Sequence, residues 1–179
     1  MEITIILCGA LLLDLLLGDP AVSWHPVALT GRLALALEGS FRRHVKSAFL
    51  AGMFCSLTVY LFFAGTAGLA VSTALRCNPS LGLFITALLV YFTIAPRSLC
   101  GHALAVEKRL LAGDLPGARR KVAMIVSRDP EALQEDGVVR SCVESLGENI
   151  ADGVTAALFY TALGWLFGGP VGAAAAAWF

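Results

Sequence analysis

Ionisable side chains gather in three clusters of an otherwise apolar sequence, and each cluster could do chemistry. The first holds Asp14, Asp19, His25 and Arg32. Two carboxylates, an imidazole and a guanidinium can hold a metal-bound phosphate or move a proton. Asp14 is the strongest candidate, because a carboxylate inside an apolar helix is costly and is usually functional. The alternative is structural: Asp19 would lie in a turn, His25 would cap the helix that Pro26 begins, and Arg32 would anchor the chain at the membrane.

The second cluster follows one stripe of a helix, because its members recur every fourth residue: Arg140, Glu144, Glu148 and Asp152. Arg140 and Glu144 alone would be an ordinary ion pair, but successive acids at this spacing repel one another. Mg²⁺ would relieve the repulsion, since it prefers oxygen ligands and shares its shell with water and substrate phosphate. We therefore expect the three acids to bind Mg²⁺. The alternative is a solvated surface stripe.

The side chains around this stripe divide the predicted helix into two faces. Ser141, Ser145 and Asn149 flank the acids. Apolar residues take the other side: Val143, Leu146, Ile150 and Val154.

The third cluster is basic and comprises Arg128 and Asp129, preceded by a basic run at 119–121. Arginines beside a membrane can bind a substrate phosphate or anionic lipid head groups. For the run at 119–121 we favour lipid contact or orientation. Arg97, which follows an apolar run, fits an anchor and a phosphate ligand equally well. No P-loop, G-x-S-x-G or H-E-x-x-H motif is present in the sequence.

Composition places these clusters in a membrane protein. Of the 179 residues, 58% are hydrophobic and only 15% are charged, and the mean hydropathy is +0.78. Soluble domains average about 25% charged residues. Three runs lack Asp, Glu, Lys and Arg altogether, namely 47–75, 77–96 and 153–179, and a membrane-spanning helix needs roughly 20 apolar residues. These values argue against disorder, a nucleic-acid-binding surface and an ordinary soluble enzyme.

Helix start and stop signals divide the chain into elements that would position the clusters. Gly18 and Pro20 end the first apolar run, and a tight polar turn at 76–79 separates two spans. Breaks are expected at Gly113-Asp114 and Asp129-Pro130. The predicted elements, in order, are an apolar run Ile3–Leu17, a short helix within 21–46, a span Ser47–Leu75, a return helix Ser80–Ala95, a water-facing helical segment 97–140, an amphipathic helix Val138–Asp152 and a charge-free run 153–179.

Basic residues predict the orientation. The segments 32–46 and 97–140 hold every Lys and Arg except Arg76, and the positive-inside rule places such segments in the cytoplasm. The expected fold is therefore all-α: a polytopic membrane helix bundle with cytoplasmic amphipathic helices, forming a single domain over residues 1–179. Because the sequence stops inside an apolar run, we interpret it as part of a longer protein.

Several ordered motifs carry a family resemblance. They are Asp14-x-x-x-Gly18-Asp19-Pro20, His25-Pro26-Val27, Gly31-Arg32, Arg97-Ser98-Leu99, Ser127-Arg128-Asp129, Arg140-x-x-Val143-Glu144-Ser145-x-x-Glu148-Asn149-x-x-Asp152-Gly153-Val154 and Ala157-Leu158-Phe159-Tyr160. Across nearly the whole chain, they resemble the adenosylcobinamide-phosphate synthase family of cobalamin biosynthesis. Two positions depart from the family pattern: Ala157 replaces a proline, and Ser141 replaces the usual alanine.

The resemblance implies a multi-pass ligase of the cell inner membrane. Such an enzyme joins a carboxylate of adenosylcobyric acid to aminopropanol or its O-phosphate, with ATP and Mg²⁺. The implied partners are the corrinoid, aminopropanol phosphate and the lipid bilayer, and no nucleic acid. A homo-oligomer or contacts with other corrinoid-pathway membrane proteins also fit. The family domain is longer than this chain, so the resemblance implies its N-terminal part and leaves open whether this part is active alone.

Site roles follow from the same resemblance combined with the clusters. Asp14, Asp19 and His25 would be catalytic, with His25 or Asp19 as the base, and Glu144, Glu148 and Asp152 would bind the metal. Substrate or phosphate binding is assigned to Arg32, Arg97, Arg128, Asp129, Arg140 and Asn149. The competing class is a non-catalytic transport or assembly subunit, whose buried charges would line a substrate path. The apolar spans 47–75 and 80–96 lack ionisable carboxylates and bases, which favours the enzyme.

Overall fold

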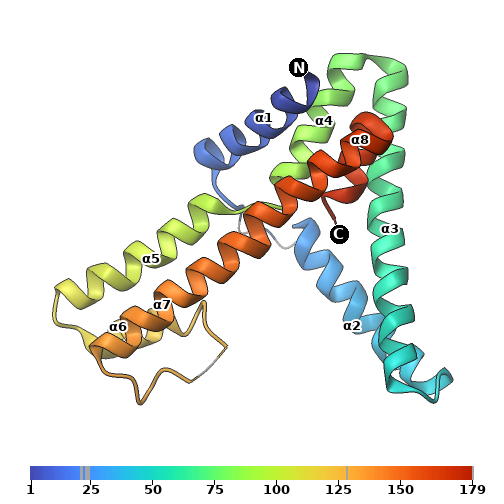
Figure 1. Cartoon of the computed structure of the whole chain (residues 1–179). Coiled ribbons are helices and arrows are strands. Elements are labelled where there is room, and N and C mark those ends of the chain that lie inside the picture. Colours follow the sequence, from blue (N-terminus) through green and yellow to red (C-terminus); the bar gives the residue numbers. More distant parts are fainter. Residues whose placement is uncertain (21, 23–24, 128, 179) are drawn as a thin grey trace. The chain divides into compact units, whose positions relative to one another are not determined.

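The computed structural model describes residues 1–20, 22, 25–127 and 129–178, and every regular element in these ranges is helical (Figure 1). The helices are α1 (Glu2–Leu17), α2 (Pro26–His44), α3 (Ala48–Cys77), α4 (Pro79–Tyr91), α5 (Pro96–Leu111), α6 (Leu115–Val122), α7 (Glu135–Ile150), the π-helix η1 (Ala151–Ala156) and α8 (Ala157–Ala176). The predicted all-α class is confirmed.

The chain forms two compact units. Unit 1 contains residues 1–94 and 157–179, and unit 2 contains residues 95–156. Each unit has its own buried apolar clusters. This division describes packing, so the predicted single domain over residues 1–179 stays a prediction.

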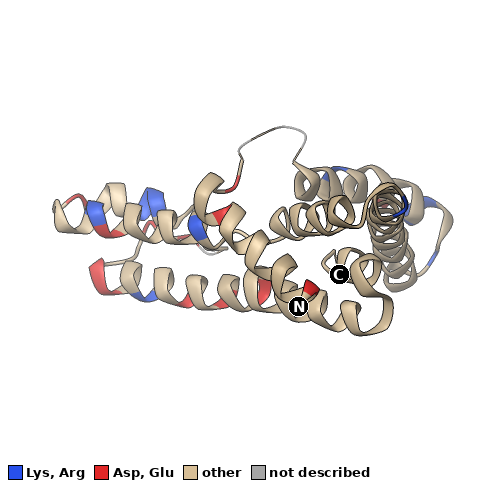
Figure 2. Ribbon diagram, turned by 90° about the horizontal axis from the view of Figure 1, so that it is seen from above, with Lys and Arg blue, Asp and Glu red and all other residues tan. Residues whose placement is uncertain are grey.

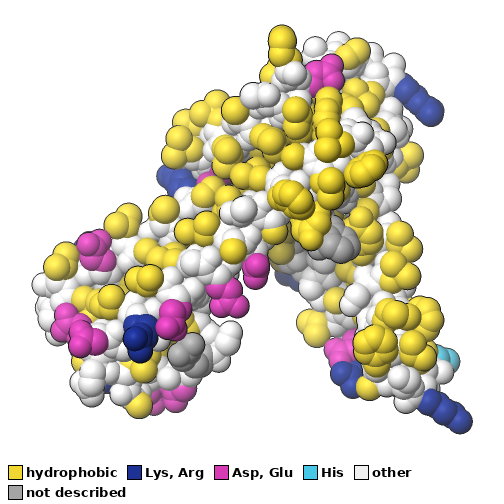
Figure 3. Space-filling model, in the orientation of Figure 1, with side chains coloured by type: hydrophobic (Ala, Val, Ile, Leu, Met, Phe, Trp, Pro, Cys, Tyr) yellow, Lys and Arg dark blue, Asp and Glu magenta, His cyan; other side chains and the backbone are white. Residues whose placement is uncertain are grey.

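Three stretches of the described chain are long and apolar enough to cross a membrane: Ala48–Cys77, Pro79–Leu111 and Glu135–Ala176. The first is α3, whose 30 residues extend about 45 Å, more than the roughly 30 Å hydrocarbon core of a bilayer. Large apolar side chains such as Phe49 and Leu69 are exposed along α3, and apolar side chains cover much of the surface in Figure 3. These features fit a multi-pass membrane protein.

The turn between α3 and α4 agrees with the predicted one. Asn78 caps α4 by accepting hydrogen bonds from the backbone amides of Ser80 and Leu81, and Pro79 takes the first helical position. Helix α4 ends at Tyr91, before the predicted Ala95. The reason is Pro96, which begins α5 and disfavours a helical conformation of Ala95, whose φ is −144°.

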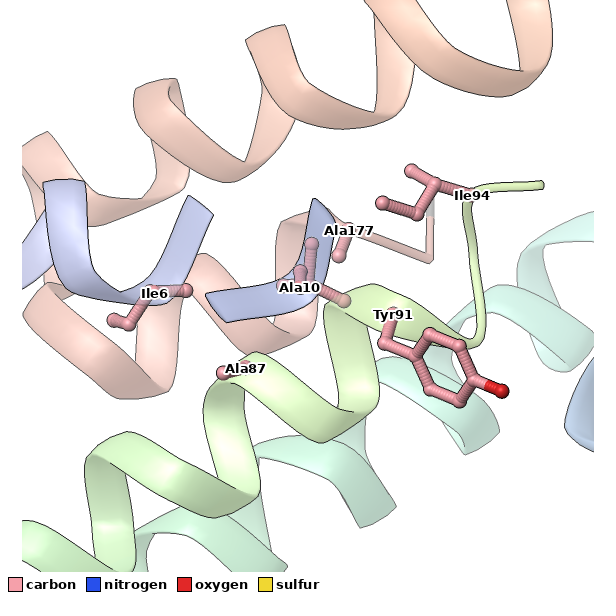
Figure 4. Packing of buried hydrophobic residues seen from close by; sticks show 7 residues of the cluster. Ile6, Ala10, Ala87, Tyr91, Ile94 and Ala177 are labelled. Carbon is pink, nitrogen blue, oxygen red and sulfur yellow. The ribbon is translucent and has the colours of Figure 1, made fainter. Parts of the chain in front are cut away.

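Helix α1 packs against α4 through small and branched residues (Figure 4). Ile6 and Ala10 of α1 are fully buried and belong to one cluster with Ala87 and Tyr91 of α4. Small residues allow the two backbones to approach closely, as in other membrane helix pairs. Asp14, further along α1, is only 1% exposed, so this helix carries a buried carboxylate among apolar neighbours.

Helix α8, which lies in the charge-free run 153–179, is not straight. It reverses at Gly168 and Gly169, where Gly169 has a φ of +57°, and Pro170 cannot continue the hydrogen-bond pattern. The two arms then lie so close that a Cβ on Gly164 would clash with the Gly172 carbonyl oxygen. Residues eight positions apart in a straight helix are about 12 Å apart, so this contact requires the hairpin.

Unit 2 packs α5, α6 and α7 around Val106, Val122 and Val138. The breaks between these helices include the two predicted ones, since α5 ends at Leu111 and α7 begins only at Glu135. Figure 2 shows many of the charged residues on these helices.

Helix α7 packs into unit 2 partly through small polar side chains. Val138, Ser141, Cys142 and Ser145 are buried, whereas Val143 is 63% exposed and Ile150 is 49% exposed. A serine hydroxyl can be buried when a backbone carbonyl accepts its hydrogen bond.

We expect the Gly164→Ala substitution to destabilise unit 1. The new methyl group would overlap a backbone carbonyl of the α8 hairpin, and overpacking of this kind costs about 1–3 kcal/mol. Thermal unfolding of the purified protein in detergent measures the loss. Gly65→Ala is the matched control, because a Cβ there meets nothing within 4 Å. Equal melting temperatures for the two variants would contradict the hairpin.

Asp114 should make the stability of unit 2 depend on acid. Its carboxylate accepts a hydrogen bond from the Gly117 amide and pairs with Arg109, and these contacts lower its pKa below the usual value. A lowered folded-state pKa gives stability that is present above the unfolded-state pKa and is lost as pH falls through the folded-state value. Hydrogen-exchange protection factors of the α6 amides should therefore fall below about pH 4, and Asp114→Asn should remove this step. If the loss of protection at acid pH is unchanged in Asp114→Asn, a group other than Asp114 causes it.

Candidate functional site

The end of α1 brings the first predicted cluster together. Helix α1 ends at Gly18, whose φ of +70° lies in the left-handed region that favours glycine, and whose amide donates to the Asp14 carbonyl at 2.7 Å. Pro20 then prevents a further helical turn. Asp19 therefore lies directly beyond the helix, in the connection that leads to α2.

Asp19 and His25 form a close pair across this connection. His25 Nε2 lies 3.0 Å from Asp19 Oδ1, within ion-pair distance although out of line for a hydrogen bond. His25 is also the N-cap residue of α2, yet its side chain makes no capping hydrogen bond. The simple capping interpretation is thus not what the imidazole does in the structure. An imidazole beside a carboxylate is suited to accept and hold a proton.

Two aromatic residues that the sequence did not single out complete this site. The Tyr91 hydroxyl donates to the Gly18 carbonyl oxygen at 2.5 Å. The rings of Phe92 and His25 meet in a T-shaped contact with centroids 5.4 Å apart. Tyr91 and Phe92 are far from α1 in sequence. Their position shortly before Pro96, where a helix break is expected, is the one signal in the sequence that connects them with a site.

The three acids of the second cluster line a cleft in unit 2 with a volume of about 390 Å³. The cleft lies between α7 and the segment that follows α6. Its lining is Ile125, Val126, Ser127, Ser141, Glu144, Ser145, Glu148, Asn149 and Asp152. The three predicted metal-binding acids and Asn149 therefore line one polar cleft. A solvated stripe on a helix surface would not need such a cleft.

Hydrogen bonds hold the walls of this cleft together. The Ser145 hydroxyl donates to the Ile125 carbonyl, and the Asn149 amide donates to the Ser145 carbonyl at 2.7 Å. Asp152 lies in the π-helix η1, and π-helical turns are often found at functional sites because the extra residue per turn redirects side chains. No pattern in the sequence predicted this change in helix type.

The cleft offers carboxylate oxygens, the ligand type that Mg²⁺ prefers. Among the described residues, no group of three or more His, Cys, Asp or Glu side chains is arranged to hold a metal ion. Mg²⁺ at nucleotide sites, however, uses one or two carboxylates and takes its other ligands from phosphate and water. The carboxylates of the cleft fit that partial role. Arg140 and Glu144 form an exposed pair at 4.0 Å, as ordinary i,i+4 partners do.

Four further site residues were predicted from the sequence, namely Arg128, Asp129, Arg32 and Arg97. Arg128 lies outside the described residues. Asp129 accepts a hydrogen bond from the Glu131 amide at 2.9 Å, an Asx turn that gives its carboxylate a structural role. It also lines a separate hollow of about 530 Å³ with Arg119 and Arg120. Arg32 on α2 and Arg97 on α5 are exposed, which agrees with either an anchor or a phosphate ligand.

Together, the apolar helices, the acid–histidine pair in unit 1 and the acidic cleft in unit 2 define a helical membrane protein with polar groups suited to chemistry. Comparison with known proteins makes this class specific. The family model described as CobD/Cbib protein matches residues 7–179. The chain therefore belongs to the CobD/CbiB family, as its motifs indicated.

Curated relatives agree with this assignment. The chain is 42% identical over 161 residues to "Cobalamin biosynthesis protein CobD" of Leptospira interrogans, which covers 90% of this chain and 50% of the relative. Proteins with the same name from Clostridium perfringens and Synechocystis are 39% and 41% identical over 154 and 166 residues, covering 85% and 91% of this chain and 49% and 48% of theirs. The chain thus spans about half the length of these relatives. No solved structure matches it.

Proposed function

We propose that this chain is part of a membrane ligase of cobalamin biosynthesis that forms an amide between adenosylcobyric acid and aminopropanol or its O-phosphate, driven by ATP. The observation that carries the proposal is the close pair of Asp19 and His25 at the end of an apolar helix. Family membership supports the pathway, since the relatives are named cobalamin biosynthesis proteins. Further proposals are an inner-membrane location and cytoplasmic basic loops, supported by the charge distribution.

The chemistry requires an activated carboxylate, either an acyl phosphate or an acyl adenylate. In the bond-forming step, the amine nitrogen bonds to the acyl carbon, and the bond from that carbon to the phosphate oxygen breaks. The proton of the attacking ammonium passes to a base, which we assign to His25 with Asp19 as its partner. A positioned base typically contributes 10²–10⁴-fold to such a step. Asp14, buried on the preceding helix, is the third member of this proposed catalytic group.

The acidic cleft of unit 2 would take part through the nucleotide. Glu144, Glu148 and Asp152 would hold Mg²⁺ with its waters, and the ion would neutralise charge on the transferred phosphate. Asn149 and Arg140 would contact substrate or phosphate oxygens, as would Arg32, Arg97, Arg128 and Asp129. The bilayer and the corrinoid are the proposed partners, and a homo-oligomer or another membrane protein of the pathway remains compatible with these roles.

A condensation assay tests the proposal and its metal role together. Full-length protein in membranes is supplied with adenosylcobyric acid, aminopropanol phosphate, ATP and Mg²⁺, and the amide product and the nucleotide product are measured. ADP would indicate an acyl phosphate and AMP an adenylate. We expect Glu148→Gln to lower activity about 10- to 100-fold and to raise the Mg²⁺ concentration needed for half activity, with normal membrane insertion.

Glu135→Gln is the matched control, because Glu135 lies in the first turn of the same helix and does not line the cleft. It should keep the wild-type Mg²⁺ dependence. Unchanged activity of Glu148→Gln at both limiting and saturating Mg²⁺ would contradict the metal role. Corrinoid uptake into vesicles by the wild-type protein, without any amide product, would instead support a transport function.

A further inference from the structure

Two consecutive aromatic residues at the end of α4 contact His25 and the residue directly before Asp19. Tyr91 is only 4% exposed, and its hydroxyl donates to the carbonyl of Gly18, the residue directly before Asp19. Phe92 makes the T-shaped contact with His25. The two rings also contact each other, with centroids 5.0 Å apart. One short segment therefore touches the chain on both sides of the connection between α1 and α2.

The hydroxyl of Tyr91 meets a backbone position that needs external support. The carbonyls in the last turn of a helix have no intrahelical amide to bind, and Gly18 is buried. Gly18 also has a backbone conformation that glycine reaches without strain but does not enforce, because it lacks a side chain. A hydrogen bond to this carbonyl therefore fixes the direction in which the chain leaves α1, and with it the position of Asp19.

The ring of Tyr91 provides a rigid base for that bond. It packs within the apolar cluster that joins α1 to α4, and in Figure 4 the hydroxyl points away from Ile6, Ala10 and Ala87. A phenol whose ring is held in the core offers its hydroxyl at a defined place with little freedom to move. Proton transfer requires such placement, because donor and acceptor must lie within hydrogen-bond reach.

We propose that Tyr91 and Phe92 are positioning residues that hold Asp19 and His25 in the geometry needed for proton transfer. Tyr91 acts through the Gly18 backbone, and Phe92 acts through the imidazole ring. Their catalytic part rests on the proposed ligase function. Their structural part, the ordering of the pair, does not depend on it.

The first test measures how the rate responds to loss of one hydroxyl. In the full-length protein, Tyr91→Phe keeps the packed ring and removes only the hydrogen bond to Gly18. We expect kcat for condensation to fall about tenfold, with KM for both substrates within about twofold of wild type. Tyr60→Phe, on half-buried Tyr60 of α3, is the matched control and should leave kcat unchanged. A wild-type kcat in Tyr91→Phe, or a change in KM alone, would overturn the positioning role.

A double-mutant cycle tests whether Tyr91 acts through Asp19. If it does, Tyr91→Phe should change kcat by no more than about twofold in an Asp19→Asn background, since the group being positioned is already lost. A full tenfold effect in that background would show that Tyr91 acts independently of Asp19, and the proposal would fail.

A measurement without activity separates this proposal from the ligase function. In the full-length protein, modification of His25 by diethyl pyrocarbonate is followed by mass spectrometry of the peptide that contains it. We expect Tyr91→Phe and Phe92→Leu each to accelerate modification about threefold, because a less ordered ring is more accessible. Rates equal to the Tyr60→Phe control would overturn the proposal. If wild-type protein forms no amide, the ligase function fails, while this rate still decides the positioning role.

Discussion

The cost of placing ionisable groups among apolar helices is the constraint on which the rest of this structure depends. Asp14 is almost fully buried on a helix whose other residues from Ile5 to Leu17 are apolar. A carboxylate in such surroundings loses its hydration, which is costly for folding. Retaining it in a fold of this kind is most simply explained by chemistry, and Asp19 and His25 lie just beyond the same helix.

The structure meets this constraint by ending helices where polar groups are needed. Helix α1 stops at Gly18, and α4 stops at Tyr91 ahead of Pro96, so the end of each helix contributes to the same site. In unit 2 the change from α7 to the π-helix η1 occurs beside the acids of the cleft. Interruptions of regular helix in membrane proteins are tolerated where other groups bind the freed backbone atoms, and the bond from Tyr91 to Gly18 is one such case.

Much of the fold could be predicted from local signals. Charge-free runs gave the span that became α3, and Pro26, Asn78-Pro79 and Pro96 marked helix starts correctly. The pairing of Asp19 with His25 was also within reach, because both belong to one short connection. The hairpin in α8 was missed because hydropathy is insensitive to chain reversal, and only the Gly168-Gly169-Pro170 sequence carried a signal. Ser141 and Ser145 of α7 are buried, which their polar side chains did not indicate. The contacts of Tyr91 and Phe92 with the connection between α1 and α2 are tertiary, and no local sequence pattern predicts them.

The central claim is that the buried carboxylate of Asp14 serves chemistry and not folding, and Asp14→Leu in the full-length protein tests it most directly. The measurement is condensation activity per folded molecule, with the melting temperature in detergent determined on the same sample. Our account predicts at least about a 100-fold loss of activity per folded molecule, which a change in the amount of folded protein cannot explain. A variant that melts at a lower temperature but keeps wild-type activity would show that Asp14 is structural and would contradict the account.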